Sequence, residues 1–271
     1  MTLGWDPDII PDPKPIPFTG WIRVVLRGVL LFTVTFGCLI ILLLLRIIER
    51  PLYGDRRPIT PYITQFVCRF AFIIMGIRHR VHGKLMEGQG AVVSNHVSWL
   101  DIFALNARKR IYFVSKSEVA NWPGIGWLAR ATGTLFIKRD SREAASQKAL
   151  FEARLQAGHK LLFFPEGTST DGSLVLAFKS TLFAAFYADG LRETLQVQPV
   201  TLRYTAPEGV EPWFYGWWGK MDFASHLVQT LASPVQGQVE VIYHDPVSVA
   251  DFADRKALAK HCELAVRSGM S

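Results

Sequence analysis

An uncharged stretch near the N-terminus, residues 28–45, limits the folding of this chain more than any other feature. Its eighteen residues are mostly apolar, with Arg23 and Arg27 before it and Arg46 and Arg50 after it. As an α-helix it would be about 27 Å long, close to the thickness of the hydrocarbon core of a bilayer. The stretch therefore predicts a helix that attaches the chain to a membrane.

A second, shorter apolar stretch at residues 66–77 is interrupted by Arg69, which favours a position at the membrane surface. The two stretches could form a hairpin within one leaflet, or the first could span the bilayer, and the flanking charges give only weak guidance between these alternatives. We expect residues 21–77 to form membrane-anchoring helices. Residues 1–20 contain five prolines and three aspartates, which is typical of a disordered leader.

The charge balance indicates an anionic partner. The net charge is +7 at neutral pH, and the mean hydropathy of +0.19 is high for a soluble enzyme. A basic protein attracts phospholipid surfaces or nucleic acid. Because of the apolar stretch we expect a membrane surface and no nucleic acid. The rival from another class is a non-enzymatic protein that binds a membrane surface or nucleic acid through its basic and aromatic residues.

The three cysteines, Cys38, Cys68 and Cys262, lie far apart and show no zinc-ligand spacing. The sequence therefore predicts neither a metal site nor a disulfide framework, and reduced thiols fit a cytoplasmic catalytic domain. It also lacks a phosphate-binding P-loop and the nucleophile elbow of serine hydrolases. We expect no cofactor.

Short apolar runs alternate with helical patterns after residue 77, and this alternation is typical of an α/β domain. We expect residues 78–271 to form a mixed, largely parallel sheet flanked by helices. The runs that predict strands are residues 78–82, 91–94, 111–115, 134–138, 161–164, 197–204 and 239–243. Helices are expected from residue 140 or 141 to 158, over residues 180–189, and over residues 251–266.

One predicted strand, residues 91–94, runs into a turn that carries His96 and then Asp101. Ser98 and Asp101 have the spacing of a capping box, so a helix should begin near Ser98. His96 then lies before that helix, at the carboxyl end of the strand, where α/β sheets bind ligands. Positions five apart on a regular helix point about 140° away from each other. The two side chains can therefore meet only if His96 folds back over the first turn.

Two interpretations of this pair follow. In the first, Asp101 accepts a hydrogen bond from one imidazole nitrogen and leaves the other nitrogen of His96 as a general base for a hydroxyl. In the second, Asp101 only caps a helix, as many aspartates do. An isolated pair with this spacing favours the second interpretation, and another stretch of the sequence reverses that preference.

That stretch, residues 161–172, is an apolar strand that ends in a loop of small polar residues and glycines. With it the chain resembles the glycerolipid acyltransferase family, whose best-known members acylate 1-acylglycerol-3-phosphate. The resemblance covers residues 75–245 and rests on four ordered blocks. These are Asn95-His96-x4-Asp101, Gly133 to Arg139, Phe164-Pro-Glu-Gly-Thr168 and Val197-Gln-Pro-Val200.

The resemblance implies an O-acyltransferase that moves an acyl chain from a thioester to the free hydroxyl of a lyso-lipid, with His96 and Asp101 as catalytic residues. We expect direct transfer without an acyl-enzyme. Backbone N–H groups at the helix start, or Lys116, would stabilise the oxyanion. The implied substrate-binding residues are Asn95, Lys116, Arg139, Glu166, Gly167 and Thr168, with Arg139 as the clamp on the acceptor's head group. The expected donor is acyl carrier protein, with coenzyme A thioesters as the alternative.

The acceptor is predicted from Ser169, where many members of the family have an arginine. A phosphomonoester would profit from two arginines, whereas lyso-ornithine lipid carries one carboxylate and an ammonium group. Residues 164–180 also resemble the subgroup that completes ornithine lipids. We expect lyso-ornithine lipid, with 1-acylglycerol-3-phosphate as the alternative. In the other interpretation of Ser169, it only caps a turn and Lys138 or Lys179 supplies the charge.

Five aromatic residues crowd into residues 213–218. They suit an anchor at a membrane interface or the lining of an acyl channel, and a plain aromatic core cluster explains them as well. His226, on a predicted helix, is expected to be structural. We expect the protein at the cytoplasmic (inner) membrane, with its catalytic domain facing the cytoplasm.

Overall fold

The computed structural model describes residues 8–88, 90–137, 144–187 and 190–271. Every strand that the sequence predicts is present, and a two-residue strand, β8, is added. The strands are β1 Arg78–His82, β2 Gly90–Ser94, β3 Tyr112–Lys116, β4 Leu135–Ile137, β5 Leu161–Phe163, β6 Gln196–Thr205, β7 Gln238–Tyr243 and β8 Val247–Ser248.

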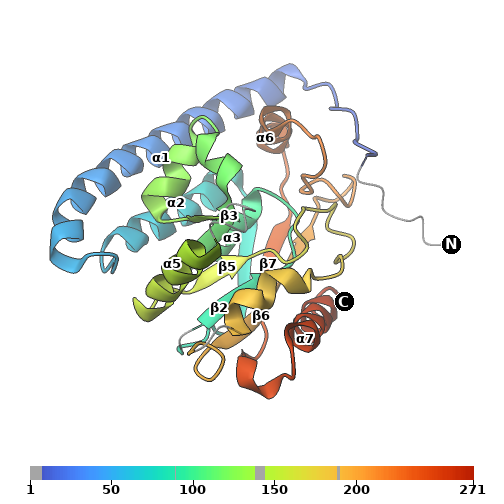
Figure 1. Ribbon diagram of the computed structural model, residues 1–271. Helices are drawn as coiled ribbons and strands as arrows, with labels where there is room; N and C mark the ends of the chain where they lie inside the picture. The colour runs from blue at the N-terminus through green and yellow to red at the C-terminus, as the bar shows by residue number, and fades with distance from the viewer. Residues whose placement is uncertain (1–7, 89, 138–143, 188–189) are drawn as a thin grey trace.

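These strands form one sheet in the order β1-β7-β6-β2-β5-β3-β4, with β8 beside β6 (Figure 1). β6 is antiparallel to β7 and to β8, and the other neighbours are parallel. The predicted class, a mixed and largely parallel sheet flanked by helices, is confirmed.

Helices cover both faces of the sheet. They are α1 Phe18–Tyr53, α2 Thr60–Met75, α3 Leu100–Asn106, α4 Ile125–Thr132, α5 Ala144–Gln156, α6 Phe223–Ala232 and α7 Arg255–Ser268. The described residues also form the 3-10 helices η1 Ser117–Asn121, η3 Ser180–Tyr187 and η4 Val249–Asp251. Along β2, Val92 packs in the core with α2 and α3, whereas Ala91 and Val93 pack in the core with α5 and α7. Burial on both faces explains why this strand is a continuous apolar run.

Two expected helices differ from the structure. Residues 180–187 form a 3-10 helix, in which positions three apart lie on one side. This geometry buries Phe183 and Phe186 together, with ring centroids 5.8 Å apart. The last helix begins at Arg255, because the side chain of Asp254 caps it by accepting hydrogen bonds from the next backbone N–H groups. The expected helix start at residue 140 or 141 lies outside the described residues.

The N-terminal helix α1 has 36 residues, and its most apolar 18-residue window has a mean hydropathy of 2.8. Within the described chain it is the helix long and apolar enough to cross a membrane. It lies along the α/β domain, and α2 returns beside it (Figure 1). Arg23 and Arg27 donate hydrogen bonds to the carbonyls of Ala232 and Leu231 at the end of α6. The helix is therefore fastened to the domain near its start as well as through α2.

The described part of the leader, residues 8–17, also contacts the domain. Trp218 Nε1 donates a hydrogen bond to the Ile9 carbonyl at 3.3 Å, and Gln229 Nε2 donates one to the Lys14 carbonyl at 2.6 Å. These contacts hold residues 8–17 against α6 and the loop that precedes it.

Candidate active site

His96 lies in the loop between β2 and α3, at the carboxyl end of a central strand. Its side chain is 22% exposed. The imidazole stacks on the ring of Phe164, with centroids 4.0 Å apart and planes within 10° of parallel. Phe164 follows β5, the neighbour of β2, so two loops at this edge of the sheet pack on each other. The histidine therefore lies at the sheet edge that the sequence predicts.

The Asp101 side chain is fully buried and accepts four hydrogen bonds. Its Oδ2 accepts from His96 Nδ1 at 2.7 Å and from the backbone N–H groups of Val97 and Ser98 at 2.8 and 3.1 Å. Its Oδ1 accepts from the Tyr204 hydroxyl at 2.8 Å. Because a carboxylate only accepts, His96 carries its proton on Nδ1 and keeps the lone pair on Nε2. This is the geometry that the first interpretation of the pair requires.

The predicted capping box is present only in part. The helix begins at Leu100, two residues after Ser98, and Asp101 accepts the Ser98 N–H as a capping box requires, whereas the Ser98 side chain makes no cap. Ser98 Oγ is buried and has no hydrogen-bond partner among the described residues. The backbone N–H groups of Val97 and Ser98 are occupied by Asp101. The expectation that N–H groups at the helix start stabilise an oxyanion is therefore wrong for these two.

The buried side chain of Glu166 holds the backbone of the His96 loop. It is 1% exposed, and its Oε1 accepts a hydrogen bond from the His96 backbone N–H at 2.7 Å. Its Oε2 accepts one from the Leu176 N–H at 2.6 Å. Burial raises the pKa of Glu166 to about 7, although these two N–H groups favour the ionised form. Both carboxylate oxygens are thus engaged with the protein.

Asn95 is engaged in the same way. Its amide donates a hydrogen bond to the Leu202 carbonyl at 2.9 Å and accepts one from the Leu202 N–H at 2.8 Å. The side chain is almost fully buried. β2 pairs with β6 up to Val200, so the Asn95 side chain continues this pairing beyond the end of β2. It fixes the point from which the His96 loop departs.

The other predicted substrate-binding residues lie around this edge of the sheet or outside the described residues. Lys116 ends β3, which β5 separates from β2, and its side chain is exposed. Thr168 is exposed, and Gly167 has a φ of 75°, which favours glycine. A Cβ atom at Gly167 would lie 2.6 Å from Lys179 Nζ. Arg139 lies outside the described residues.

Sequence reasoning did not single out Tyr204. It comes from β6, 103 positions after the aspartate whose orientation it fixes. The signal that could have found it is the period of two along this strand. Val200 and Leu202 are buried in the core that contains α3, and Tyr204 packs against the same core. A tyrosine hydroxyl on this buried face needs a polar partner.

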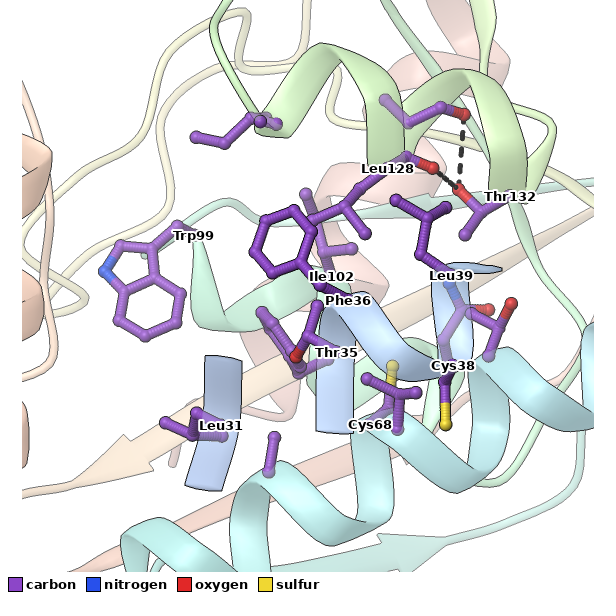
Figure 2. Close-up of a pocket in the computed structure, with 18 of the residues that line it drawn as sticks. Leu31, Thr35, Phe36, Cys38, Leu39, Cys68, Trp99, Ile102, Leu128 and Thr132 are labelled. Atoms are coloured by element: carbon purple, nitrogen blue, oxygen red, sulfur yellow. Dashed lines mark hydrogen bonds between the residues drawn. The ribbon is translucent and has the colours of Figure 1, made fainter. Parts of the chain in front are cut away.

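An apolar cavity of about 470 Å³ lies between the N-terminal helices and the α/β domain (Figure 2). Residues of α1, α2, α3, α4 and α6 line it. Figure 2 shows Trp99, Leu31, Phe36, Leu39 and Leu128 around this space. Phe113 also lines the cavity, and its ring centroid lies 6.2 Å from that of Phe164, the ring on which His96 stacks.

The aromatic cluster at residues 213–218 does not contribute to the wall of this cavity, as far as the described residues show. The acyl-channel interpretation of the cluster is therefore wrong for this cavity. Tyr215 and Trp218 are buried, whereas Trp213 is 39% exposed. Trp217 donates its backbone N–H to the Val97 carbonyl at 2.9 Å. The cluster is mainly a core element that also holds the His96 loop.

The chain is similar to known proteins in sequence and in fold. A family model described as acyltransferase matches residues 78–203. A lyso-ornithine lipid O-acyltransferase of Rhodobacter capsulatus is 57% identical over 98% of this chain and 96% of its own length. A 1-acyl-sn-glycerol-3-phosphate acyltransferase of Neisseria gonorrhoeae is 40% identical over 42% of this chain and 43% of that protein.

Among solved structures, the 1-acyl-sn-glycerophosphate acyltransferase of Thermotoga maritima superposes with a TM-score of 0.64. The match covers 92% of this chain and 95% of that one at 21% identity, which shows a shared fold. The alignment with the Rhodobacter relative covers nearly the whole length of both proteins, and its identity of 57% shows a family relationship as well as a shared fold. Its identity, together with the matching family model, establishes that this chain belongs to the acyltransferase family.

Proposed function

We propose that this acyltransferase moves an acyl chain from a thioester to the free hydroxyl of lyso-ornithine lipid, giving ornithine lipid. The observation that carries the proposal is the His96–Asp101 pair, whose Nδ1–Oδ2 distance is 2.7 Å, which leaves the lone pair of the imidazole on Nε2. The identity with the Rhodobacter enzyme supports the choice of acceptor. The alternative acceptor is 1-acylglycerol-3-phosphate, on which the partly matching Neisseria enzyme acts.

In the proposed mechanism, His96 Nε2 takes the proton of the acceptor hydroxyl as its oxygen attacks the thioester carbonyl. The carbonyl electron pair moves onto oxygen and gives a tetrahedral oxyanion. When that pair returns, the C–S bond breaks and the thiolate takes the proton back from His96. Asp101 stays ionised throughout and stabilises the imidazolium between the two proton transfers. The products are an ester and a thiol, and no acyl-enzyme forms.

The acceptor's polar head is proposed to lie over the loop after β5. Gly167 and Thr168 lie at this surface, and the ammonium group of Lys179 lies beside Gly167. Lys179 is exposed and suits a carboxylate, and Arg139 keeps the clamp role that the four blocks imply. Asn95 and Glu166 are proposed to act by holding the His96 loop, because their polar atoms bind the protein. Lys116 remains the proposed source of charge for the oxyanion.

The N-terminal helices are proposed to lie in one leaflet of the cytoplasmic membrane, with the domain on the cytoplasmic side. α1 contacts α6 through Arg23 and Arg27, and Phe36 of α1 lies near Gly124, which precedes α4. A helix held to the domain at both places cannot cross a bilayer without drawing the domain into it. We therefore divide the chain into a leader (1–20), an anchor (21–77) and an acyltransferase domain (78–271).

The acyl chain of the thioester is proposed to occupy the apolar cavity, and Ala129→Phe tests this. Ala129 lines the cavity on α4, so a phenyl ring there takes up room that the far end of a chain would need. Each methylene left outside costs about 0.8 kcal/mol, or roughly fourfold in kcat/KM. We expect the preference to move toward shorter acyl thioesters. Ala153→Phe, on the exposed surface of α5, is the matched control. An unchanged chain-length profile in Ala129→Phe would place the acyl chain elsewhere.

The acceptor is tested with purified protein in detergent, using both acceptors with acyl carrier protein and coenzyme A thioesters. We expect the highest kcat/KM with lyso-ornithine lipid and acyl carrier protein. Activity with 1-acylglycerol-3-phosphate alone would refute the proposed acceptor, and no transfer to either would refute lyso-lipid acylation.

Ser169→Arg is expected to shift the ratio of kcat/KM values toward the phosphate-bearing acceptor by about tenfold, the worth of one charge-assisted hydrogen bond. Ser169 is only 8% exposed, so the variant's thermal unfolding must be measured beside its activity. Ser169→Ala is the matched control and should leave the ratio unchanged. A folded Ser169→Arg enzyme with the original ratio would remove residue 169 from head-group selection.

A further inference from the structure

A second cavity, of about 240 Å³, opens beside the turn between α1 and α2. Its wall includes Arg56 and Arg57 from this turn, Arg110 and Tyr112 from the start of β3, and His159 from the turn before β5. β3 and β5 are parallel to β2, and His96 follows the carboxyl end of β2. The second cavity therefore lies at the opposite edge of the sheet from His96.

Positive charge exceeds negative charge around this cavity. Arg57 donates to the Ala131 carbonyl at 2.6 Å, and Arg110 donates to the Tyr62 hydroxyl. Arg154, at the end of α5, donates to the Gly133 carbonyl at 2.6 Å. Among the residues that the structure describes, Arg56, Arg57, Arg110 and Arg154 form no ion pair, although the exposed Asp55 carboxylate lies near enough to act on Arg154. One exposed carboxylate does not balance four arginines.

Glu49, a buried carboxylate at the end of α1, has partners of its own. Glu49 forms an ion pair with Arg46 at 3.1 Å. Its oxygens also accept hydrogen bonds from the N–H groups of Ile59 and Thr60 and from the Thr60 hydroxyl. Glu49 thus fastens the start of α2 to the end of α1; its ion-pair partner is Arg46, and its charge acts on Arg57 only from a distance.

His159 adds a second, independent sign of a ligand. It is 4% exposed, and its Nε2 atom has no hydrogen-bond partner in the described part of the chain. Arg154 Nε donates to its Nδ1 at 2.6 Å, so the neutral ring carries its proton on Nε2. Burial, and then the charges of Arg154 and Arg57, lower the pKa of His159 to about 4, against the opposite effects of the backbone and the carboxylate charge of Asp55. A buried N–H group without an acceptor in a positively charged wall is suited to an anion.

We propose that this cavity binds a phosphate group, at a site separate from the active site. Arginine offers the forked donors that phosphate oxygens accept, and the His159 Nε2–H adds a buried donor. Two sources of such a group are possible: the head group of an anionic phospholipid and a soluble phosphate compound. The site lies where α1 ends, next to Leu52, Tyr53 and Tyr62, which are 68%, 50% and 53% exposed. Exposed tyrosines beside apolar residues are typical of the head-group layer of a membrane.

A bound phosphate would connect three parts of the chain that are distant in sequence. It would contact the α1–α2 turn through Arg56 and Arg57, the start of β3 through Arg110, and the turn before β5 through His159. The N-terminal helices would thereby be fixed to the domain at the end opposite to the contacts with α6. We therefore expect the site to act on membrane attachment and orientation rather than on the transfer step.

The test compares three full-length proteins. Arg56→Gln/Arg110→Gln removes two exposed arginines of the site, and neither supports the backbone through its side chain. Arg80→Gln/Arg255→Gln removes the same charge from exposed positions on β1 and at the start of α7. Binding is measured by sedimentation with phosphatidylcholine vesicles, with and without phosphatidylglycerol. In parallel, inorganic phosphate is titrated calorimetrically into each protein in detergent.

Phosphatidylglycerol should strengthen vesicle binding of the natural protein and of the control. The affinity of Arg56→Gln/Arg110→Gln for these vesicles should be about tenfold lower than that of the control. That loss supports the site with a lipid phosphate as ligand. A second outcome also supports the site, with a soluble phosphate compound as ligand. In it, all three proteins bind vesicles equally, and only Arg56→Gln/Arg110→Gln fails to bind inorganic phosphate. The proposal is overturned if Arg56→Gln/Arg110→Gln and the control behave alike in both measurements. Acyl transfer is assayed separately, so this result does not depend on the proposed acceptor.

Discussion

His96→Ala is expected to lower kcat/KM for acyl transfer by about 100- to 10,000-fold, the usual worth of a positioned general base. The hydroxyl of a lyso-lipid is a poor nucleophile at neutral pH, and in the proposed mechanism His96 Nε2 takes its proton. Asp101 is fully buried, and His96 is the histidine bonded to it. The measurement is the rate of ester formation from an acyl thioester and lyso-ornithine lipid.

The alanine also removes a ring that stacks on Phe164, so loss of packing must be separated from loss of the base. His96→Phe keeps an aromatic ring at this position and removes both nitrogens. It should lose as much activity as the alanine variant. His261→Ala, at an exposed position on α7, is the matched control and should behave as the natural protein. If either His96 variant kept near-normal turnover while folded, His96 would not be the base.

The same variants separate an enzyme from a binding protein. His96 lies in the loop between β2 and α3 and is not part of the exposed apolar surface of α1. Membrane sedimentation of His96→Ala should therefore equal that of the natural protein. A protein that only binds membranes would show no phenotype in any assay, whereas the acyltransferase loses turnover alone.

Local patterns predicted most of the fold because they depend on neighbouring residues. The buried run at residues 91–93 identified β2 and the turn that carries His96. Where the prediction failed, a contact distant in sequence decided the outcome. Asp101 makes the predicted bond to the Ser98 N–H, but it also binds the Val97 N–H and His96 and is itself held by Tyr204. The spacing of Ser98 and Asp101 contains no information on that tyrosine.

Glu166, in the third sequence block (residues 164–168), is a second case in which a contact distant in sequence could not be predicted. The resemblance implied that Glu166 contacts the acceptor, and its sequence neighbours gave no sign that its carboxylate would be buried. In the structure it accepts the N–H groups of His96 and Leu176, 70 positions before it and ten after it. The Thr170 N–H donates to the His96 carbonyl at 3.0 Å and adds a second contact from this loop. The block that resembles a substrate-binding loop, residues 164–168, therefore also fixes the backbone of the His96 loop.

The apolar cavity could not be predicted from any one segment. Its wall combines α1 and α2 with α3, α4 and α6, so it exists only once the N-terminal helices lie on the domain. From the sequence, the apolar residues of α1 indicate a membrane, and the aromatic residues 213–218 suit a membrane anchor, a channel lining or a core cluster equally. In the structure, one side of α1 lines the cavity, and apolar residues on the rest of the helix stay exposed. One helix can thus face the domain on one side and lipid on the other.

Asp101→Asn is expected to lower kcat by about 100- to 10,000-fold and to leave KM nearly unchanged, because the side chain orients His96 without contacting substrate. The structure allows the asparagine to keep its place. Its oxygen can accept from His96 Nδ1 and the two backbone N–H groups, while its amide nitrogen faces Tyr204, whose hydroxyl also accepts hydrogen bonds. The loss would then come from the missing charge that stabilises the imidazolium.

Tyr204→Phe separates that charge from the geometry. It removes the hydroxyl that donates to Asp101 Oδ1 and leaves the carboxylate ionised, so we expect a smaller loss of kcat, about tenfold for one hydrogen bond to a charged group. Tyr243→Phe, at another buried tyrosine on the neighbouring strand β7, is the matched control. The expected order of kcat is control, Tyr204→Phe, then Asp101→Asn. If Asp101→Asn stayed within about twofold of the natural enzyme, far less than the usual loss for such a group, Asp101 would be only a support of the loop, as the second interpretation of the pair holds.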